Sequence, residues 1–123
     1  MIGSDGLSLG EKPHPRLWGT FPRVLGHYSR DIGLFPLETA IWKMSGLTAR
    51  NFGLGRRGTL EVGNHADVVV FDAATIKDRA TYDTPTEAAD GVEAVVVNGA
   101  LTWWQGAHCG ARAGEVITRS GLS

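Results

Sequence analysis

The dipeptide Asn98-Gly99, set between two runs of strand-forming residues, constrains the fold of this chain more than any other feature. The run before it, residues 92–97, reads VEAVVV, and the run after it, residues 100–105, reads ALTWWQ. A two-residue type I′ turn needs positive φ at both central positions, and asparagine and glycine tolerate that conformation better than other residues do. The sequence therefore predicts an antiparallel hairpin here.

A third strand is predicted at residues 66–72, because the run ADVVVFD is short and β-branched. It is apolar on both faces, which is typical of a strand covered on both sides. The cover is either the helices of the first half or polypeptide outside this chain, a second copy included, and both alternatives stay open. Residues 73–90 are predicted to form a surface loop anchored by Ile76. Val116 and Ile117 can add a last short strand.

The first half of the chain carries helical spacing instead of alternation. Its first helix is predicted to start at Thr20 as N-cap, with Pro22 in the first turn, and to end at Gly33. A second helix is predicted over residues 36–45, with Gly46 placed to end it.

A third, short helix is predicted over residues 48–52, and a glycine-rich connection over residues 54–65 separates helices from strands. The predicted fold class is α+β. We expect a helical part over residues 1–54 and a β part over residues 55–123.

Composition and charge argue against several classes of function. The net charge is −1 and the basic residues are scattered, so no nucleic-acid partner is expected. No apolar run approaches the ~20 residues that span a bilayer, and residues 1–12 lack the features of a signal peptide. Cys109 is the only cysteine, so no internal disulfide forms. A cytoplasmic location is expected.

The histidines do not form a metal-binding motif. His14, His27, His65 and His108 show none of the spacings that metal sites use. His27 is interpreted as a solvated residue on the polar side of the first helix, and His65 as a turn residue. His108 and Cys109 are neighbours in a glycine-rich segment predicted as a loop, and adjacency is poor geometry for two ligands of one ion.

The segment Ser4-Asp5-Gly6 is the main candidate for chemistry. A carboxylate beside glycines can ligate a metal or move a proton, because glycine lets backbone and substrate approach closely. Arg16, which follows His14-Pro15, can hold a carboxylate in a bidentate manner. From the residues alone, an ordinary turn is the stronger interpretation of Ser4-Asp5-Gly6.

Longer blocks of sequence resemble a known family. The blocks are SDG, HPRLWGTFPRVLGHYSRD, LETAIWKMSGLTARNFGL, RRGTLEVGNHADVVVFD, ATYDTPTEAADGVEAVVVNGALTWWQG and ARAGEVI. In this order they resemble the D-aminoacylase branch of the amidohydrolase superfamily, over about residues 2–117. The strand and hairpin blocks are shared with dihydropyrimidinase and dihydroorotase relatives, whereas SDG with HPR-x-x-GTFPRVLG is far more specific.

The resemblance implies an architecture in which a (β/α)8 barrel with a zinc site joins a small β-sandwich. Residues 1–54 would then be the end of the last barrel strand with the terminal helices, and residues 55–123 the C-terminal share of the sandwich. The fold is expected to be incomplete as a single chain. Open strand edges, with Trp103 and Trp104 exposed, would favour a homo-oligomer or association with a missing barrel segment. In the alternative, one of these tryptophans is core and the other surface.

The resemblance also implies a reaction, the zinc-dependent hydrolysis of N-acyl-D-amino acids to a D-amino acid and a carboxylate. Asp5 matches a general acid/base beside zinc, and therefore a possible metal ligand, and Arg16 matches a binder of the substrate's α-carboxylate. Ser4 and His14 receive no role. Zinc needs three or four protein ligands, so we expect no zinc on this chain alone and no activity from it. The alternatives are a non-catalytic domain that self-associates, or a dihydropyrimidinase- or dihydroorotase-like specificity.

Overall fold

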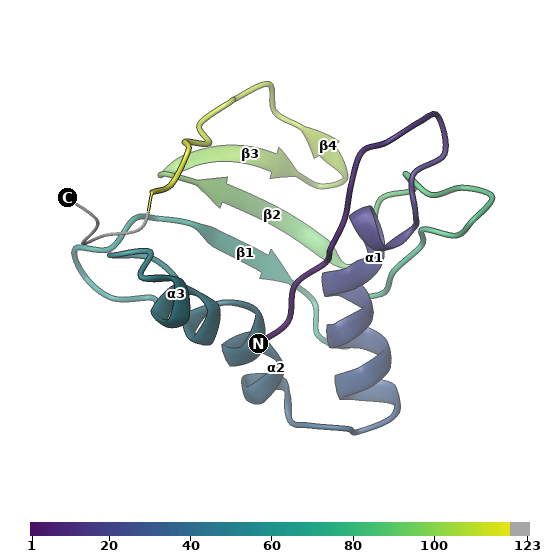
Figure 1. The fold of residues 1–123 in the computed structure, drawn as a ribbon, viewed down its shortest axis with the longest axis horizontal. Helices are drawn as coiled ribbons and strands as arrows, with labels where there is room; N and C mark the ends of the chain where they lie inside the picture. Colours follow the sequence, from purple (N-terminus) through teal and green to yellow (C-terminus); the bar gives the residue numbers. More distant parts are fainter. Residues whose placement is uncertain (119–123) are drawn as a thin grey trace.

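Helices occupy the first half of the chain and strands the second, as the computed structural model shows for residues 1–118 (Figure 1). The helical elements are α1 (Arg16–Arg23), the π-helix η1 (Val24–Asp31), α2 (Leu37–Met44) and α3 (Gly46–Phe52). The strands are β1 (Val68–Phe71), β2 (Val92–Val97), β3 (Ala100–Trp104) and β4 (Ala107–His108). The predicted α+β fold class is confirmed. Within the described residues, no helix has both the length and the apolar character needed to cross a membrane.

The four strands form one antiparallel sheet in the order β1-β2-β3-β4. Asn98 and Gly99 have φ values of 47° and 80°, so the predicted hairpin is confirmed with positive φ at both turn positions. Strand β4 was not predicted. Gln105 and Gly106 also take positive φ, 46° and 86°, and this second tight turn returns the chain along β3. His108 is therefore a strand residue, and its assignment to a loop was wrong.

Two further predictions concern the β half of the chain, a strand at residues 116–117 and the exposure of two tryptophans. Val116 and Ile117 form no strand, and Val116 is almost fully exposed. Trp103 is half-buried while Trp104 is exposed, which is closer to the alternative of one core and one surface tryptophan than to two exposed ones.

Strand β1 lies at an edge of the sheet and is only partly covered. Phe71 packs on the core, while Val69 and Val70 are exposed. The helices thus cover part of the strand that the sequence marks as apolar on both faces. The rest of its apolar surface is open within residues 1–118.

The first helix starts one turn earlier than predicted. It begins at Arg16, and Thr20 lies inside it, where its Oγ1 donates a hydrogen bond of 2.8 Å to the Arg16 carbonyl. Pro22 is therefore inside the helix rather than in its first turn. A proline there removes a backbone donor and crowds the preceding turn, and the wider π-helix η1 begins two residues later. Gly33, at φ 68°, follows the helix as predicted.

The next two helices match their predictions closely but meet at a sharper junction. Helix α2 ends at Met44, and α3 begins at Gly46, the glycine expected to end α2. A side chain on Gly46 would collide with the Trp42 ring, so the packing of α3 against α2 requires glycine there. Gly53 ends α3 in the left-handed conformation, at φ 63°.

One buried cluster joins the helices to the loop before β2. Val24, Leu25 and Ala40 come from the helices, and Ile76 comes from the loop. Ile76 is 1% exposed, which confirms it as the predicted anchor. Its carbonyl accepts a hydrogen bond of 2.8 Å from Arg30 Nη1. The division into residues 1–54 and 55–123 stays a prediction.

Candidate functional site

Asp5 and Arg16, the two residues singled out in the sequence, form an ion pair. Arg16 Nη2 lies 3.1 Å from Asp5 Oδ2. The Asp5 side chain is 83% exposed and that of Arg16 is 39% exposed. Because both side chains are exposed, the pair is accessible to a ligand from solvent. An ion pair this exposed also contributes little to the stability of a fold.

The backbone around Asp5 is shaped by its neighbours. Asp5 has φ 49°, a left-handed conformation that aspartate visits more readily than most residues do. Ser4 Oγ accepts a hydrogen bond of 3.2 Å from the Gly6 backbone N–H. A Cβ on Gly6 would lie 2.8 Å from Leu17 Cα, so only glycine lets this segment pass the start of α1.

Arg16 is the first residue of α1, and both its backbone N–H and its carbonyl are hydrogen-bonded. His14 Nδ1 accepts a hydrogen bond of 3.0 Å from the Arg16 backbone N–H, and the Arg16 carbonyl accepts one from Thr20. The guanidinium is not saturated. Its Nε is buried and has no hydrogen-bond partner within residues 1–118, so the group keeps donor capacity beyond its contact with Asp5.

Sequence reasoning assigned no role to His14 and missed Tyr82. The Tyr82 hydroxyl lies 3.0 Å from His14 Nε2, and the two rings meet edge-on with centroids 5.1 Å apart. Tyr82 stands in the polar loop between β1 and β2. No sequence pattern marks it, because it meets His14 across 68 positions of the chain.

Residues 1–118 do not form a zinc site by themselves. Among residues 1–118, no group of three or more His, Cys, Asp and Glu side chains lies close enough together to hold a metal ion. Asp5 is paired with a cation rather than with a second ligand. His108 is the last residue of strand β4, and the exposed Cys109 follows it.

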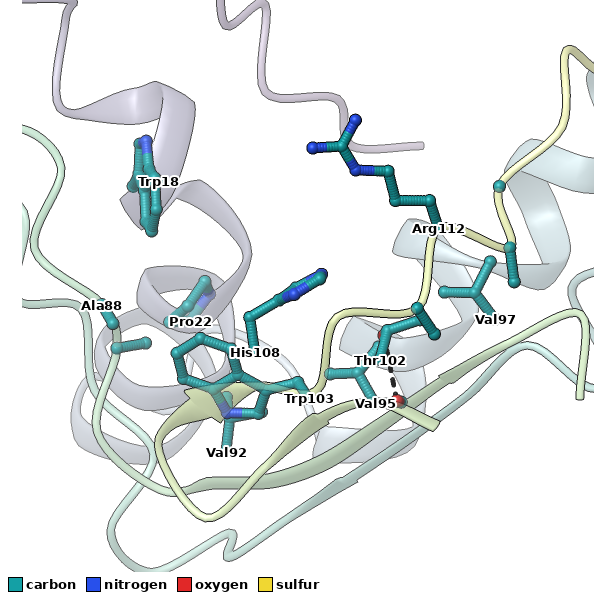
Figure 2. A pocket seen from close by; sticks show the side chains of 14 residues that line it. Trp18, Pro22, Ala88, Val92, Val95, Val97, Thr102, Trp103, His108 and Arg112 are labelled. Atoms are coloured by element: carbon teal, nitrogen blue, oxygen red, sulfur yellow. Dashed lines mark hydrogen bonds between the residues drawn. The ribbon is translucent and has the colours of Figure 1, made fainter. Parts of the chain in front are cut away.

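Two apolar cavities lie away from the ion pair. One, of about 510 Å³, has Trp18 and Pro22 of α1 on one side and Trp103 and His108 on the other (Figure 2). Another, of about 620 Å³, lies between the helices and β1, with Phe21 among its lining residues. Within the described part of the chain, neither cavity is lined by Asp5 or Arg16. The ion pair therefore stands on an open surface.

A second Asp–Arg pair is built differently. Arg57 Nη1 contacts the Asp67 carboxylate, and Arg57 Nη2 donates a hydrogen bond of 2.7 Å to Asn98 Oδ1. The Asn98 backbone N–H donates to Asp67 Oδ1 at 2.8 Å, and its Nδ2 donates to the Ala113 carbonyl at 2.6 Å. The hydrogen bond from Asn98 and the pairing with Arg57 lower the pKa of Asp67 below its usual value. This network ties the hairpin turn to the loop before β1.

Comparison with known proteins finds similarity over nearly the whole chain. Residues 1–102 match the amidohydrolase family. D-aminoacylase of Alcaligenes xylosoxydans xylosoxydans is 63% identical over 120 residues, which cover 98% of this chain and 25% of that protein.

Two solved structures are similar in fold as well as in sequence. One is a D-aminoacylase whose binuclear metal center was studied, with a TM-score of 0.93 and 63% identity over 97% of this chain and 25% of that one. The other is N-acyl-D-glutamate deacylase from Bordetella bronchiseptica, complexed with zinc and a phosphonate inhibitor. It has a TM-score of 0.87 and 51% identity over 95% of this chain and 24% of that one. The chain thus spans about a quarter of the length of these relatives.

Proposed function

The chain belongs to the amidohydrolase family, and on that premise we propose that it serves as the C-terminal part of an N-acyl-D-amino-acid deacylase. The family resemblance expected from the SDG and HPR blocks is confirmed. The proposed reaction adds water across the amide C–N bond of an N-acyl-D-amino acid and releases a D-amino acid and a carboxylate. This chain would supply Asp5 and Arg16.

The observation that carries the proposal is the 3.1 Å contact between Asp5 and Arg16. In the proposed reaction the Asp5 carboxylate takes a proton from the attacking water and passes it to the leaving amine. The C–O bond forms first, as the proton moves to Asp5, and gives a tetrahedral intermediate. The C–N bond then breaks as Asp5 gives this proton to the leaving amine, so Asp5 ends the turnover as a carboxylate.

Arg16 is proposed to bind the α-carboxylate of the substrate. Guanidinium groups bind carboxylates through two parallel N–H donors, and the Arg16 side chain is 39% exposed and therefore within reach of a ligand. A bound substrate would then compete with Asp5 for Arg16. This competition would release the Asp5 carboxylate for proton transfer at the moment when substrate is present.

We place the zinc ligands of the complete enzyme, Asp5 apart, outside residues 1–118, because these residues assemble no group of three or more side chains that could hold a metal ion. Related proteins have been studied with a binuclear metal center or with zinc. The chain alone is therefore proposed to be inactive. The cytoplasmic location stays a prediction.

Exposed apolar side chains support the proposal that the chain associates with other polypeptide. Leu60 is 83% exposed, and Val69, Val70 and Trp104 each expose about half of their surface. Strand β1 also lies at an edge of the sheet, and an edge strand can pair with another chain. The partner is proposed to be a barrel segment or a second copy of the chain. The second of these partners would also suit a non-catalytic, self-associating domain.

A chimera tests the catalytic proposal directly. The matched 120-residue segment of the Alcaligenes D-aminoacylase is replaced by this chain, and hydrolysis of N-acetyl-D-amino acids is measured, with the L enantiomers as controls. We expect turnover of the D substrates by the chimera and none by the chain alone. A folded chimera without turnover, or stoichiometric zinc with turnover from the chain alone, would overturn the proposal.

A further inference from the structure

His14 connects the candidate site to the loop between β1 and β2. Its Nδ1 accepts a hydrogen bond of 3.0 Å from the Arg16 backbone N–H. Its Nε2 lies 3.0 Å from the Tyr82 hydroxyl. Because Nδ1 is an acceptor here, the proton of the neutral ring sits on Nε2, which donates to the Tyr82 oxygen. The two contacts together select one tautomer and one ring orientation.

The contact with Arg16 caps helix α1. The first backbone N–H groups of a helix have no partner inside it, and the Arg16 N–H is the first of α1. The His14 ring accepts this hydrogen bond, and the His14 carbonyl accepts the next one, from Leu17, at 3.0 Å. This double contact accounts for a helix that starts at Arg16 rather than near Thr20. It also fixes where the Arg16 side chain leaves the helix, beside Asp5.

Tyr82 is placed at this point by a loop that runs along α1 (Figure 1). Asp78 pairs with Arg23 of α1 at 3.3 Å. Closer to the tip, Thr81 and Thr84 are joined by hydrogen bonds of 2.9 to 3.2 Å between their side chains and backbones. The Tyr82 side chain is largely exposed. Burial therefore does not explain its position, and the contact with His14 does.

We propose that Tyr82 is a positioning residue for the Asp5–Arg16 site. It holds the His14 ring in the tautomer that caps α1, and thereby fixes the position from which the Arg16 guanidinium reaches either Asp5 or a substrate carboxylate. Tyr82 acts through His14 and does not touch the reacting atoms. The proposed consequence for catalysis rests on the function proposed above, whereas the effect on His14 and Arg16 does not.

The structural effect is tested by NMR on the full chain, with Tyr82→Phe compared with Tyr28→Phe. Tyr28 is the matched control, because its ring meets His27 at 5.0 Å and 70°, close to the 5.1 Å and 77° of the Tyr82 pair. In the Tyr82→Phe chain we expect the Nε2–H tautomer of His14 to lose population and the Arg16 amide to exchange about fivefold faster, the equivalent of one hydrogen bond. The Tyr28→Phe chain should match the parent in both. An unchanged tautomer and exchange rate in Tyr82→Phe would overturn the proposal.

The consequence for catalysis is tested in the chimera with D-aminoacylase. Tyr82→Phe should raise KM about fivefold with kcat nearly unchanged, because one hydrogen bond that orients a binding residue is lost. His14→Asn keeps an acceptor for the Arg16 N–H but loses the contact with Tyr82. Adding Tyr82→Phe to it should therefore have almost no further effect.

Additive effects of these two substitutions would overturn the coupling between Tyr82 and His14. If the unsubstituted chimera is inactive, the proposed function fails, and the NMR comparison alone decides the role of Tyr82. If the chimera is active but Tyr82→Phe changes neither the His14 tautomer, the Arg16 amide exchange nor KM, only the positioning role fails.

Discussion

Two of the Asp–Arg ion pairs in residues 1–118, Asp5–Arg16 and Asp67–Arg57, differ in exposure and in their further hydrogen bonds. The Asp5–Arg16 pair has side chains 83% and 39% exposed, and the Arg16 Nε has no partner within residues 1–118. The Asp67–Arg57 pair has side chains 35% and 10% exposed. Asp67 and Arg57 are further bonded to Asn98, which is itself bonded to the Ala113 carbonyl.

The difference lies in how completely each pair is satisfied. A charged pair whose donors and acceptors are all hydrogen-bonded within the same chain stabilises the fold. Breaking such a pair leaves polar groups without partners. A pair whose side chains are largely exposed can exchange one partner for a ligand, because solvent reaches both groups. The Asp67 pair is therefore structural, and the Asp5 pair is the one proposed to meet a substrate.

Removing the Asp5 charge should have the largest effect. In the chimera with D-aminoacylase, Asp5→Asn is expected to lower kcat by about 10² to 10⁴, the usual range for loss of a general acid/base. Its thermal midpoint should equal that of the parent chimera, because the pair is exposed. Steady-state kinetics and a thermal scan check both parts. Unchanged kcat would remove Asp5 from the chemistry.

The matching substitution in the other pair should act on stability. Asp67→Asn in the chain is expected to lower the free energy of unfolding by about 2 kcal/mol, because hydrogen bonds to a charged group are lost. Asp5→Asn in the same chain should change it by less than about 0.5 kcal/mol. Urea titrations of the three proteins measure both values. Equal losses from the two substitutions would break the distinction between the pairs.

Arg16→Lys should separate binding from chemistry. Lysine keeps the charge but cannot present two parallel donors to a carboxylate. In the chimera we expect KM to rise about tenfold, roughly 1.4 kcal/mol, with kcat much less affected. The opposite pattern, a fall in kcat at constant KM, would assign Arg16 to the transition state rather than to the substrate carboxylate.

The smallest expected effect is a change in the unfolding free energy at acidic pH. The folded-state pKa of Asp67 is lowered, first by the hydrogen bond from Asn98 and then by Arg57. Its stabilising contribution is therefore complete above the usual aspartate pKa of about 3.9 and is lost as the pH falls through the lower folded value. The difference in unfolding free energy between the parent and Asp67→Asn should shrink over that acid range. A difference that stays constant with pH would show that the charge of Asp67 is not what stabilises the network.

Predictions from sequence succeeded where a short stretch of backbone decides the outcome. The Asn98-Gly99 turn and the helix end at Gly33 formed as expected, because positive φ at these positions is a local preference. The second hairpin turn was missed because Gln105 is not a usual residue for positive φ. The strand at residues 116–117 failed because strand propensity does not supply a pairing partner.

The site was predictable in part. Asp5 and Arg16 were found from their motifs, and the structure brings them together. The start of α1 was misplaced because its cap is a histidine ring rather than one of the usual side chains. Tyr82 carries no local signal at all, since its relation to the site exists only through contact with His14.

The sequence by itself determined the order of helices and strands, the hairpin and the family, because these follow from preferences of neighbouring residues and from long matching blocks. Only the tertiary structure decided that the Asp67–Arg57 pair is saturated and that the Asp5–Arg16 pair is largely exposed. Saturation depends on donors and acceptors that meet across tens of residues, such as Asn98 with Asp67 and Ala113. Such contacts are made by packing, which no local pattern encodes.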